Sequence, residues 1–182
     1  MKIAMLDPSL FTGRYDDSLC AALARAWQEV VLHGRPTRAT DAITPEGYVY
    51  RASFFPVSER LRGLIGDGAA FRAVKAAEYL AAATVGSTRF LADADVLHVQ
   101  WLPFPPADAR LLARISAAGT RRPALVHTVH NASAFHGDSG AQARGYRALL
   151  DRFDALIVHG ETTRQALLEQ GMAAERLHIV PH

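Results

Sequence analysis

Residues 124–130 read Ala124-Leu-Val-His-Thr-Val-His130, and this stretch decides the fold. A short and nearly continuous apolar run predicts a strand of a parallel sheet whose two faces are both covered by helices. Similar runs recur along the chain between longer stretches of helical periodicity, which is the pattern of βαβ units. The sequence therefore predicts an α/β, Rossmann-like, doubly wound fold, with a mainly parallel sheet of about seven strands in a three-layer αβα arrangement.

The apolar runs and the helical patterns place the expected elements. The strands are expected at Lys2–Leu6, Glu29–His33, Tyr48–Ser53, Val96–Trp101, Ala124–His130, Ala155–His159 and Leu177–Val180. The helices are expected at Asp17–Ala26, Gly68–Ala92, Pro106–Ala118, Gly140–Phe153 and Thr162–Gln170. Glycine, proline and threonine predict a loop at Gly34–Gly47 and a second, mobile stretch at Pro56–Gly68.

Length and composition fit one domain. The chain has 182 residues and is 49% hydrophobic, so we expect residues 1–182 to form a single Rossmann-like domain. A formal charge of +2 gives no strong field for phosphate backbones, and we expect no nucleic-acid partner. Cys20 has no disulfide partner, Met1–Asp7 is too short for a signal peptide, and no run is apolar enough for a membrane span. We therefore expect a cytoplasmic protein.

The loops that follow the strands are the candidate sites, because an open parallel sheet binds ligands at the carboxyl ends of its strands. Three loops stand out, at Asp7–Ser18, Gln100–Pro106 and Thr128–Asp138. The first places Gly13 and hydroxyl side chains before a helix, where an anion can bind, or it is an ordinary strand-to-helix turn. It has neither the dinucleotide G-x-G-x-x-G pattern nor a P-loop, so we expect neither NAD nor ATP and no cofactor.

Aromatic and imidazole side chains lie at the ends of the fourth and fifth expected strands. Trp101 and Phe104 form an apolar platform for a sugar ring or fill the core under a rigid turn. His130 precedes a long polar loop, so it can hydrogen-bond a ligand hydroxyl or titrate near neutral pH. His127 falls on the opposite face of the strand and His98 lies mid-strand, and both are expected to be structural.

Two further chemistries have little support in the sequence. His130 and His136 have no H-E-x-x-H or C-x-x-C companion, so we expect no metal site. The chain also lacks the G-x-S-x-G elbow of serine hydrolases.

Four segments together resemble the N-terminal domain of the retaining family-four glycosyltransferases, which have the two-domain GT-B architecture. They are Lys2–Asp7 with the Gly13 loop, Ala94–Pro103, Leu125–Asn131, and Phe153–Glu161 running to Arg176–His182. The third and fourth match the family's T-x-H-[DN] strand end, its A-D-x-[IV]-[IV]-x-S/H strand and its [IV]-x-[VI]-[IP]-P-[HN]-G element, which here stops at Pro181-His182. The resemblance implies that the chain is the N-terminal, acceptor-side half and lacks the nucleotide-sugar half.

The resemblance and the strand ends together give the expected site. His130 is expected to line the cleft near the reacting sugar as the catalytic residue. The expected substrate contacts are Gly13, Arg14, Trp101, Asn131, His159, Gly160 and Glu161. The Gly13 loop would approach the donor diphosphate or the acceptor, although the family often has paired glycines where this chain has one.

The implied activity is transfer of a sugar from a nucleotide-sugar donor to an acceptor hydroxyl, with retention at the anomeric carbon. By family analogy the donor phosphate helps to deprotonate the acceptor, and His130 orients a donor hydroxyl or stabilises developing charge. The family's nucleotide-binding residues lie in the second domain, so the chain alone is expected to be inactive. Half of a GT-B nucleotide-sugar epimerase and a non-catalytic flavodoxin-like binding domain stay open as alternatives, and an acceptor at a membrane surface stays open too.

Overall fold

Seven parallel strands form one sheet in the computed structural model, which describes residues 1–86, 88–102, 104–119, 121–131 and 140–181. The strands are β1 (Lys2–Leu6), β2 (Glu29–Gly34), β3 (Val49–Ala52), β4 (Val96–Val99), β5 (Ala124–Thr128), β6 (Ala155–Val158) and β7 (Leu177–Ile179). Their order is β3-β2-β1-β4-β5-β6-β7, so the chain winds outward from β1 and then restarts at β4 beside it. The expected seven-stranded parallel sheet is confirmed, and its switch point lies between β1 and β4.

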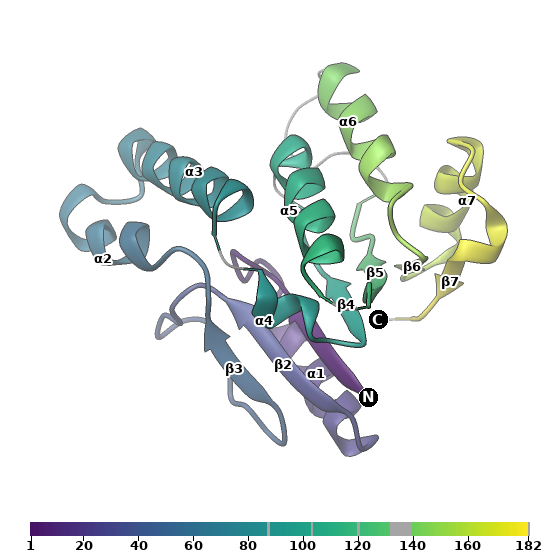
Figure 1. The fold of residues 1–182 in the computed structure, drawn as a ribbon, viewed down its shortest axis with the longest axis horizontal. Coiled ribbons are helices and arrows are strands. Elements are labelled where there is room, and N and C mark those ends of the chain that lie inside the picture. Colours follow the sequence, from purple (N-terminus) through teal and green to yellow (C-terminus); the bar gives the residue numbers. More distant parts are fainter. Residues whose placement is uncertain (87, 103, 120, 132–139, 182) are drawn as a thin grey trace.

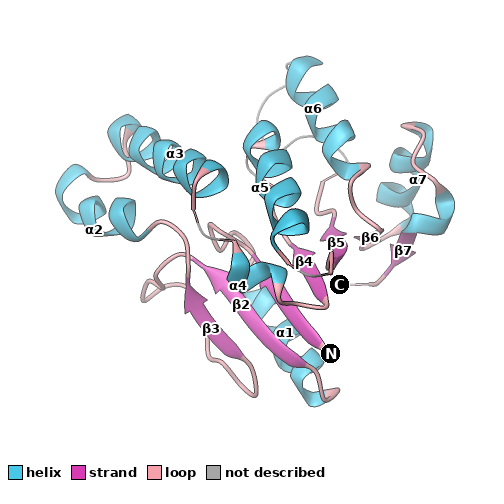
Figure 2. Ribbon diagram, in the orientation of Figure 1, coloured by secondary structure: helices cyan, strands magenta, loops and turns pink. Residues whose placement is uncertain are grey.

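Helices cover both faces of this sheet (Figures 1 and 2). They are α1 (Gly13–Arg25), α2 (Pro56–Ile65), α3 (Ala69–Thr84), α4 (Arg89–Ala92), α5 (Pro105–Ala118), α6 (Gly140–Leu150) and α7 (Glu161–Glu169), with a 3-10 turn at Ala174–Arg176. Alternation along β1 separates the two cores: Ile3 and Met5 pack with α1, whereas Ala4 and Leu6 pack in the larger core on the α5 side. Burial on both faces explains why the central strands are nearly continuous apolar runs, whereas the edge strands β3 and β7 are largely exposed.

The prediction of a mobile stretch at Pro56–Gly68 is wrong, because Pro56–Ile65 form α2. Proline stands at the helix start, where its missing N–H is not needed. The carboxylate of Glu78 on α3 accepts the N–H groups of Val57 and Ser58, each at 2.8 Å, and so caps the helix from outside. A cap that comes from a distant residue leaves no local signal in the sequence.

The single helix expected at Gly68–Ala92 is also wrong, since the chain forms α3 and then the short α4. The N–H of Gly86 bonds Ala81 O at 3.2 Å after the end of α3. A Cβ atom on Gly86 would stand 2.7 Å from Ala82 O, so the chain turns away there only because the residue is glycine. Among the described helices, none combines the length and apolar character that a bilayer crossing requires.

Candidate functional site

Four rings gather at the carboxyl edge of the sheet, close to the switch point. Trp101 follows β4, His130 follows β5, His159 follows β6, and Tyr15 lies in the first turns of α1. The Trp101 and His130 rings are stacked, with centroids 4.9 Å apart and planes 7° from parallel. Tyr15 meets His130 edge-on at 5.8 Å and His159 at 5.4 Å, and the two imidazole centroids are 5.4 Å apart. Parallel strands end at one edge, which brings these distant residues together.

The first loop holds the indole of Trp101 in place. Trp101 Nε1 donates to Thr12 Oγ1 at 3.0 Å, and Phe11 meets the indole edge-on with centroids 5.5 Å apart. The Thr12 N–H in turn donates to Asp7 Oδ2 at 3.1 Å. The loop thus fixes the ring on which His130 stacks.

A buried carboxamide decides which nitrogen of His130 carries a proton. Gln100 is 0% exposed, and its Nε2 faces Met5 Sδ at 3.0 Å and His98 Nε2 at 3.4 Å. Its Oε1 therefore faces His130 Nε2, at 3.1 Å. A carboxamide oxygen can only accept, so the neutral ring of His130 carries its proton on Nε2 and has Nδ1 as its acceptor nitrogen.

His98 and His127 are structural, as their positions in the strand predicted. His98 Nε2 bonds Thr128 Oγ1 at 2.8 Å, and burial lowers the pKa of His98 to about 4. His127 Nδ1 donates to Val99 O at 2.8 Å, and burial lowers the pKa of His127 to about 3. Both imidazoles are neutral at physiological pH, so they add no charge beneath the ring cluster.

A buried pair of acids, Asp7 and Asp16, lies under Thr12, and both are 0% exposed. The Thr12 hydroxyl lies 3.4 Å from oxygens of both carboxyl groups. Burial, and next the charge of Asp7, raise the pKa of Asp16 well above its ordinary value. Asp7 Oδ1 has no donor within the described residues, and a proton on Asp16 supplies one. The raised pKa of Asp16 therefore favours a proton shared between the two carboxyl groups.

The residues expected at the start of α1 lie beside this pair. Gly13 opens the helix and is buried, and a Cβ atom there would stand 3.3 Å from Ile43 Cδ1 and 3.6 Å from Asp41 O. This glycine allows the loop after β2 to pack closely against α1. Arg14 is exposed on the first turn.

The remaining expected residues lie on the strand-end loops. Asn131 is exposed, and its carbonyl accepts the Tyr146 hydroxyl at 3.4 Å. His159 Nδ1 donates to Val180 O at 3.0 Å, which ties the imidazole to the end of the described chain.

Gly160 and Glu161 begin α7. Gly160 is the N-cap residue, with an extended φ of −167° and open space around its Cβ position. Glu161 is exposed and pairs with Arg164 at 3.0 Å, one turn along the helix.

Sequence reasoning missed Tyr15, Gln100 and Thr12, which position the rings. Gln100 lies in the second candidate loop next to Trp101, and the available signal was its position at the end of the expected buried strand. His136, which was weighed with His130 as a metal ligand and not expected to be one, lies outside the described residues with the rest of residues 132–139, as does Pro103. Among the described side chains, no group of three His, Cys, Asp or Glu residues converges as metal ligands do.

Residues 12–182 match the family described as Glycosyltransferase Family 4. The chain belongs to this family. No curated protein matches the chain by sequence. The match covers nearly the whole chain and confirms the resemblance to the N-terminal domain of family-four, GT-B glycosyltransferases.

Solved structures of similar fold include both transferases and epimerases. HepE of Anabaena, in complex with UDP and glucose, is 16% identical with a TM-score of 0.56, and the match covers 100% of this family-four chain and 44% of the HepE chain. The lipopolysaccharide outer core galactosyltransferase WaaB is 10% identical with a TM-score of 0.59, over 100% and 46%. UDP-GlcNAc 2-epimerase from Methanocaldococcus jannaschii is 13% identical with a TM-score of 0.54, over 99% and 45%. At these identities the likeness shows the fold, and the chain spans less than half the length of each.

Proposed function

We propose that this family-four domain is the acceptor-side half of a glycosyltransferase that moves a sugar from a nucleotide-sugar donor to an acceptor hydroxyl, with retention at the anomeric carbon. The observation that carries the proposal is the cluster of Tyr15, Trp101, His130 and His159 at the sheet edge where GT-B domains meet their ligands. The UDP and glucose bound to HepE support a nucleotide-sugar donor.

The ring cluster suits recognition of a sugar. Trp101 and His130 cover one face of each other, and both are half-buried, so the stack offers its remaining exposed ring surface as a rigid aromatic wall against which the apolar face of a pyranose ring can pack. His130 Nδ1 accepts a hydrogen bond from a sugar hydroxyl in the neutral ring and donates one in the protonated ring. Because Gln100 and Trp101 fix the imidazole from two sides, this group is oriented before the substrate arrives.

The proposal includes a division of work between two domains. A second domain would hold the nucleotide, so the 182-residue chain should bind little UDP-sugar and transfer none. The test compares this chain with the whole natural protein that contains it, using UDP-sugars and a panel of acceptors, and determines the anomeric configuration of the product by NMR. Turnover by the 182-residue chain alone, or an inverted product, would contradict the proposal.

A nucleotide-sugar epimerase is the second candidate, because an epimerase has the same fold over 99% of this chain. The two activities differ in their need for an acceptor. Incubation of the whole protein with a UDP-sugar alone should leave the sugar unchanged if it is a transferase. Epimerised sugar in that reaction would favour the second candidate, and a protein without either reaction would be a binding domain.

A further inference from the structure

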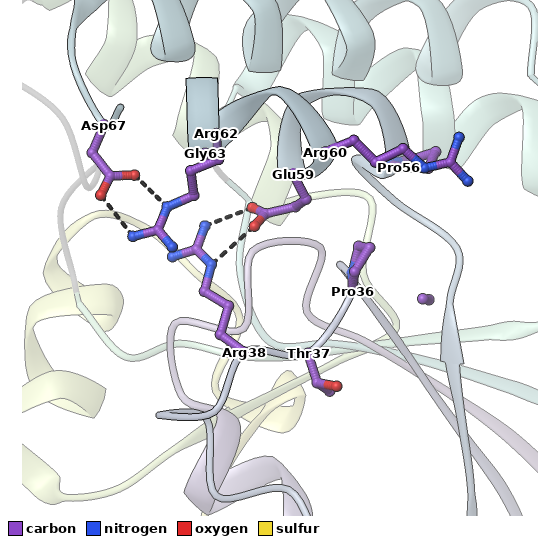
Figure 3. Close-up of a pocket in the computed structure, with 10 residues that line it drawn as sticks. Pro36, Thr37, Arg38, Pro56, Glu59, Arg60, Arg62, Gly63 and Asp67 are labelled. Carbon is purple, nitrogen blue, oxygen red and sulfur yellow. Dashed lines mark hydrogen bonds and ion pairs between the residues drawn. The ribbon is translucent and has the colours of Figure 1, made fainter. Parts of the chain in front are cut away.

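A cavity of about 720 Å³ opens at the carboxyl edge of β2 and β3, on the same edge of the sheet as the ring cluster (Figure 3). Its walls are the loop after β2, the end of β3 and the helix α2. The residues that matter to its chemistry are Arg38, Glu59, Arg60, Arg62, Gly63 and Asp67. This volume lies within the range of small-molecule sites, whereas the crevice beside His130 measures about 10 Å³.

Two arginines stand side by side in the cavity, each held by its own carboxylate (Figure 3). Arg38 donates through Nε and Nη2 to Glu59 at 2.9 and 2.6 Å, and Arg62 donates through Nε and Nη2 to Asp67 at 2.5 and 2.6 Å. The two pairs also interact electrostatically, since the pKa of Asp67 is lowered first by the hydrogen bond from Arg62 and further by the charge of Arg38. Within the described residues, Nη1 of either guanidinium bonds no carboxylate.

The charges that line the cavity do not balance. The basic side chains are Arg38, Arg60 and Arg62, and the acidic ones are Glu59 and Asp67. Arg60 makes no ion pair within the part of the chain that the structure describes. The surplus is therefore positive and belongs to Arg60, whose side chain points away from the two paired arginines in Figure 3. The groups that an oxyanion would meet between the two pairs are the guanidinium groups of Arg38 and Arg62, which their carboxylates already orient.

Gly63 lies on the helical wall of the cavity without a structural need for glycine. A Cβ atom at this position would meet nothing within 4 Å. Glycine inside a helix is less favourable than alanine by about 1 kcal/mol, so its presence has a cost to folding. What the missing side chain provides is open volume in the cavity.

We propose that this cavity binds an oxyanion, phosphate or carboxylate, that the acceptor carries away from the hydroxyl that receives the sugar. The inference rests on the proposed function and adds the class of acceptor to it. The strands β2 and β3 are three and four steps from β5 in the sheet order, and each step is about 4.8 Å, so along the sheet the cavity lies roughly 14–19 Å from the end of β5 that carries His130. The acceptor is therefore an elongated acidic molecule, longer than one sugar ring.

Binding to the 182-residue chain tests the inference without any transfer reaction. Glucose 6-phosphate, glucuronate and glucose are titrated separately and followed by calorimetry and amide NMR shifts. We expect binding of one or both charged sugars and no binding of glucose, and the charged sugar that binds identifies phosphate or carboxylate as the group recognised. If neither charged sugar binds at millimolar concentration, or if glucose binds equally well, the proposal fails.

Variants separate the cavity from general surface charge. Arg62→Gln should weaken binding of the charged sugar by roughly tenfold or more, since it removes one charge-assisted donor. Its partner Asp67 has a side chain 61% exposed and stays solvated, so the variant should fold. The control Arg72→Gln changes the same charge on the exposed face of α3, outside the cavity, and should change affinity less than twofold. Equal losses in the two variants would overturn the proposal.

Gly63 offers a test that leaves all charges unchanged. Gly63→Leu should narrow the cavity next to Arg62 and weaken binding of the charged sugar by roughly tenfold or more, and wild-type affinity in this variant would overturn the proposal. Gly63→Ala is the matched control, in which the melting temperature should rise while binding persists.

The outcome for the cavity is independent of the outcome for the transferase. If a charged sugar binds and Arg62→Gln loses it while the whole protein transfers no sugar, the proposed function fails and the oxyanion site stands. If the whole protein transfers sugar but no charged sugar binds, the oxyanion site alone fails.

Discussion

Replacing Gln100 by leucine tests whether this buried carboxamide sets the proton position on His130. Gln100 is 0% exposed and leucine has a similar volume, so the variant should keep its packing while losing the bond to His130 Nε2. A neutral hydrogen bond contributes about 0.5–1.5 kcal/mol net, which corresponds to a roughly two- to tenfold change in the ratio of the two neutral tautomers. The expected change is from the Nε2–H form toward the Nδ1–H form.

The assay is long-range ¹⁵N–¹H NMR of the histidines at alkaline pH, which reports the tautomer ratio of each neutral imidazole. His178 on β7 is exposed and serves as an internal control, whose tautomer ratio should be the same in both proteins. Chemical denaturation of the same samples should show a loss of about 1–2 kcal/mol, because His98 loses a weaker contact as well. An unchanged tautomer ratio at His130 in a folded Gln100→Leu protein would refute the assignment.

Three further predictions concern the acids and the ring cluster. Burial and the charge of Asp7 raise the folded-state pKa of Asp16 above the unfolded value of 3.8, so the wild-type free energy of unfolding should fall as the pH rises above about 4. Asp16→Asn should therefore be more stable than the wild type at pH 7.5. Urea titrations that show the same difference in unfolding free energy between the two proteins at pH 4.5 and at pH 7.5 would contradict this. Burial raises the pKa of the Asp108 carboxyl to about 7, and the hydrogen bond from Tyr79 at 2.5 Å opposes this rise. Tyr79→Phe should therefore raise this pKa further, which a ¹³C titration of the carboxyl group measures. In the whole protein, His130→Ala should lower turnover by roughly 10²–10³ with little change in melting temperature, and a destabilised but active variant would remove His130 from the site.

The sequence predicted the elements whose signal is local. Apolar runs located the central strands, because strands buried on both faces are apolar nearly throughout, and shorter runs located the more exposed edge strands β3 and β7. Helix α2 was missed because its N-terminus is capped by Glu78, which lies 20 and 21 residues further along the chain than the two N–H groups that it accepts. The proline and glycines of this stretch indicated a loop instead. Gly86 likewise divided α3 from α4 through a close backbone approach that only the folded chain reveals.

The candidate site was predicted as far as topology alone could place it. Trp101, His130 and His159 end neighbouring parallel strands, so the strand order was sufficient to bring their backbones together. Tyr15 and Gln100 were missed because their contacts depend on the phase of α1 and on the orientation of a buried side chain. Neither quantity follows from the apolar pattern that locates the elements.

The start of α1 does not offer the anion site that the sequence suggested for the loop after β1. The helix N-terminus after β1 was a candidate for anion binding, but the Thr12 N–H is already bonded to Asp7, and an incoming anion would also meet the buried charge of the Asp7–Asp16 pair. In the same loop, the Thr12 hydroxyl instead accepts a hydrogen bond from Trp101 Nε1. Two guanidinium groups lie further along the edge, where Arg38 and Arg62, each paired with a carboxylate, line the cavity beside α2. In the proposed transferase, the loop after β1 would therefore position the sugar platform, the acceptor's acidic group would lie at β2 and β3, and a second domain would hold the donor phosphates.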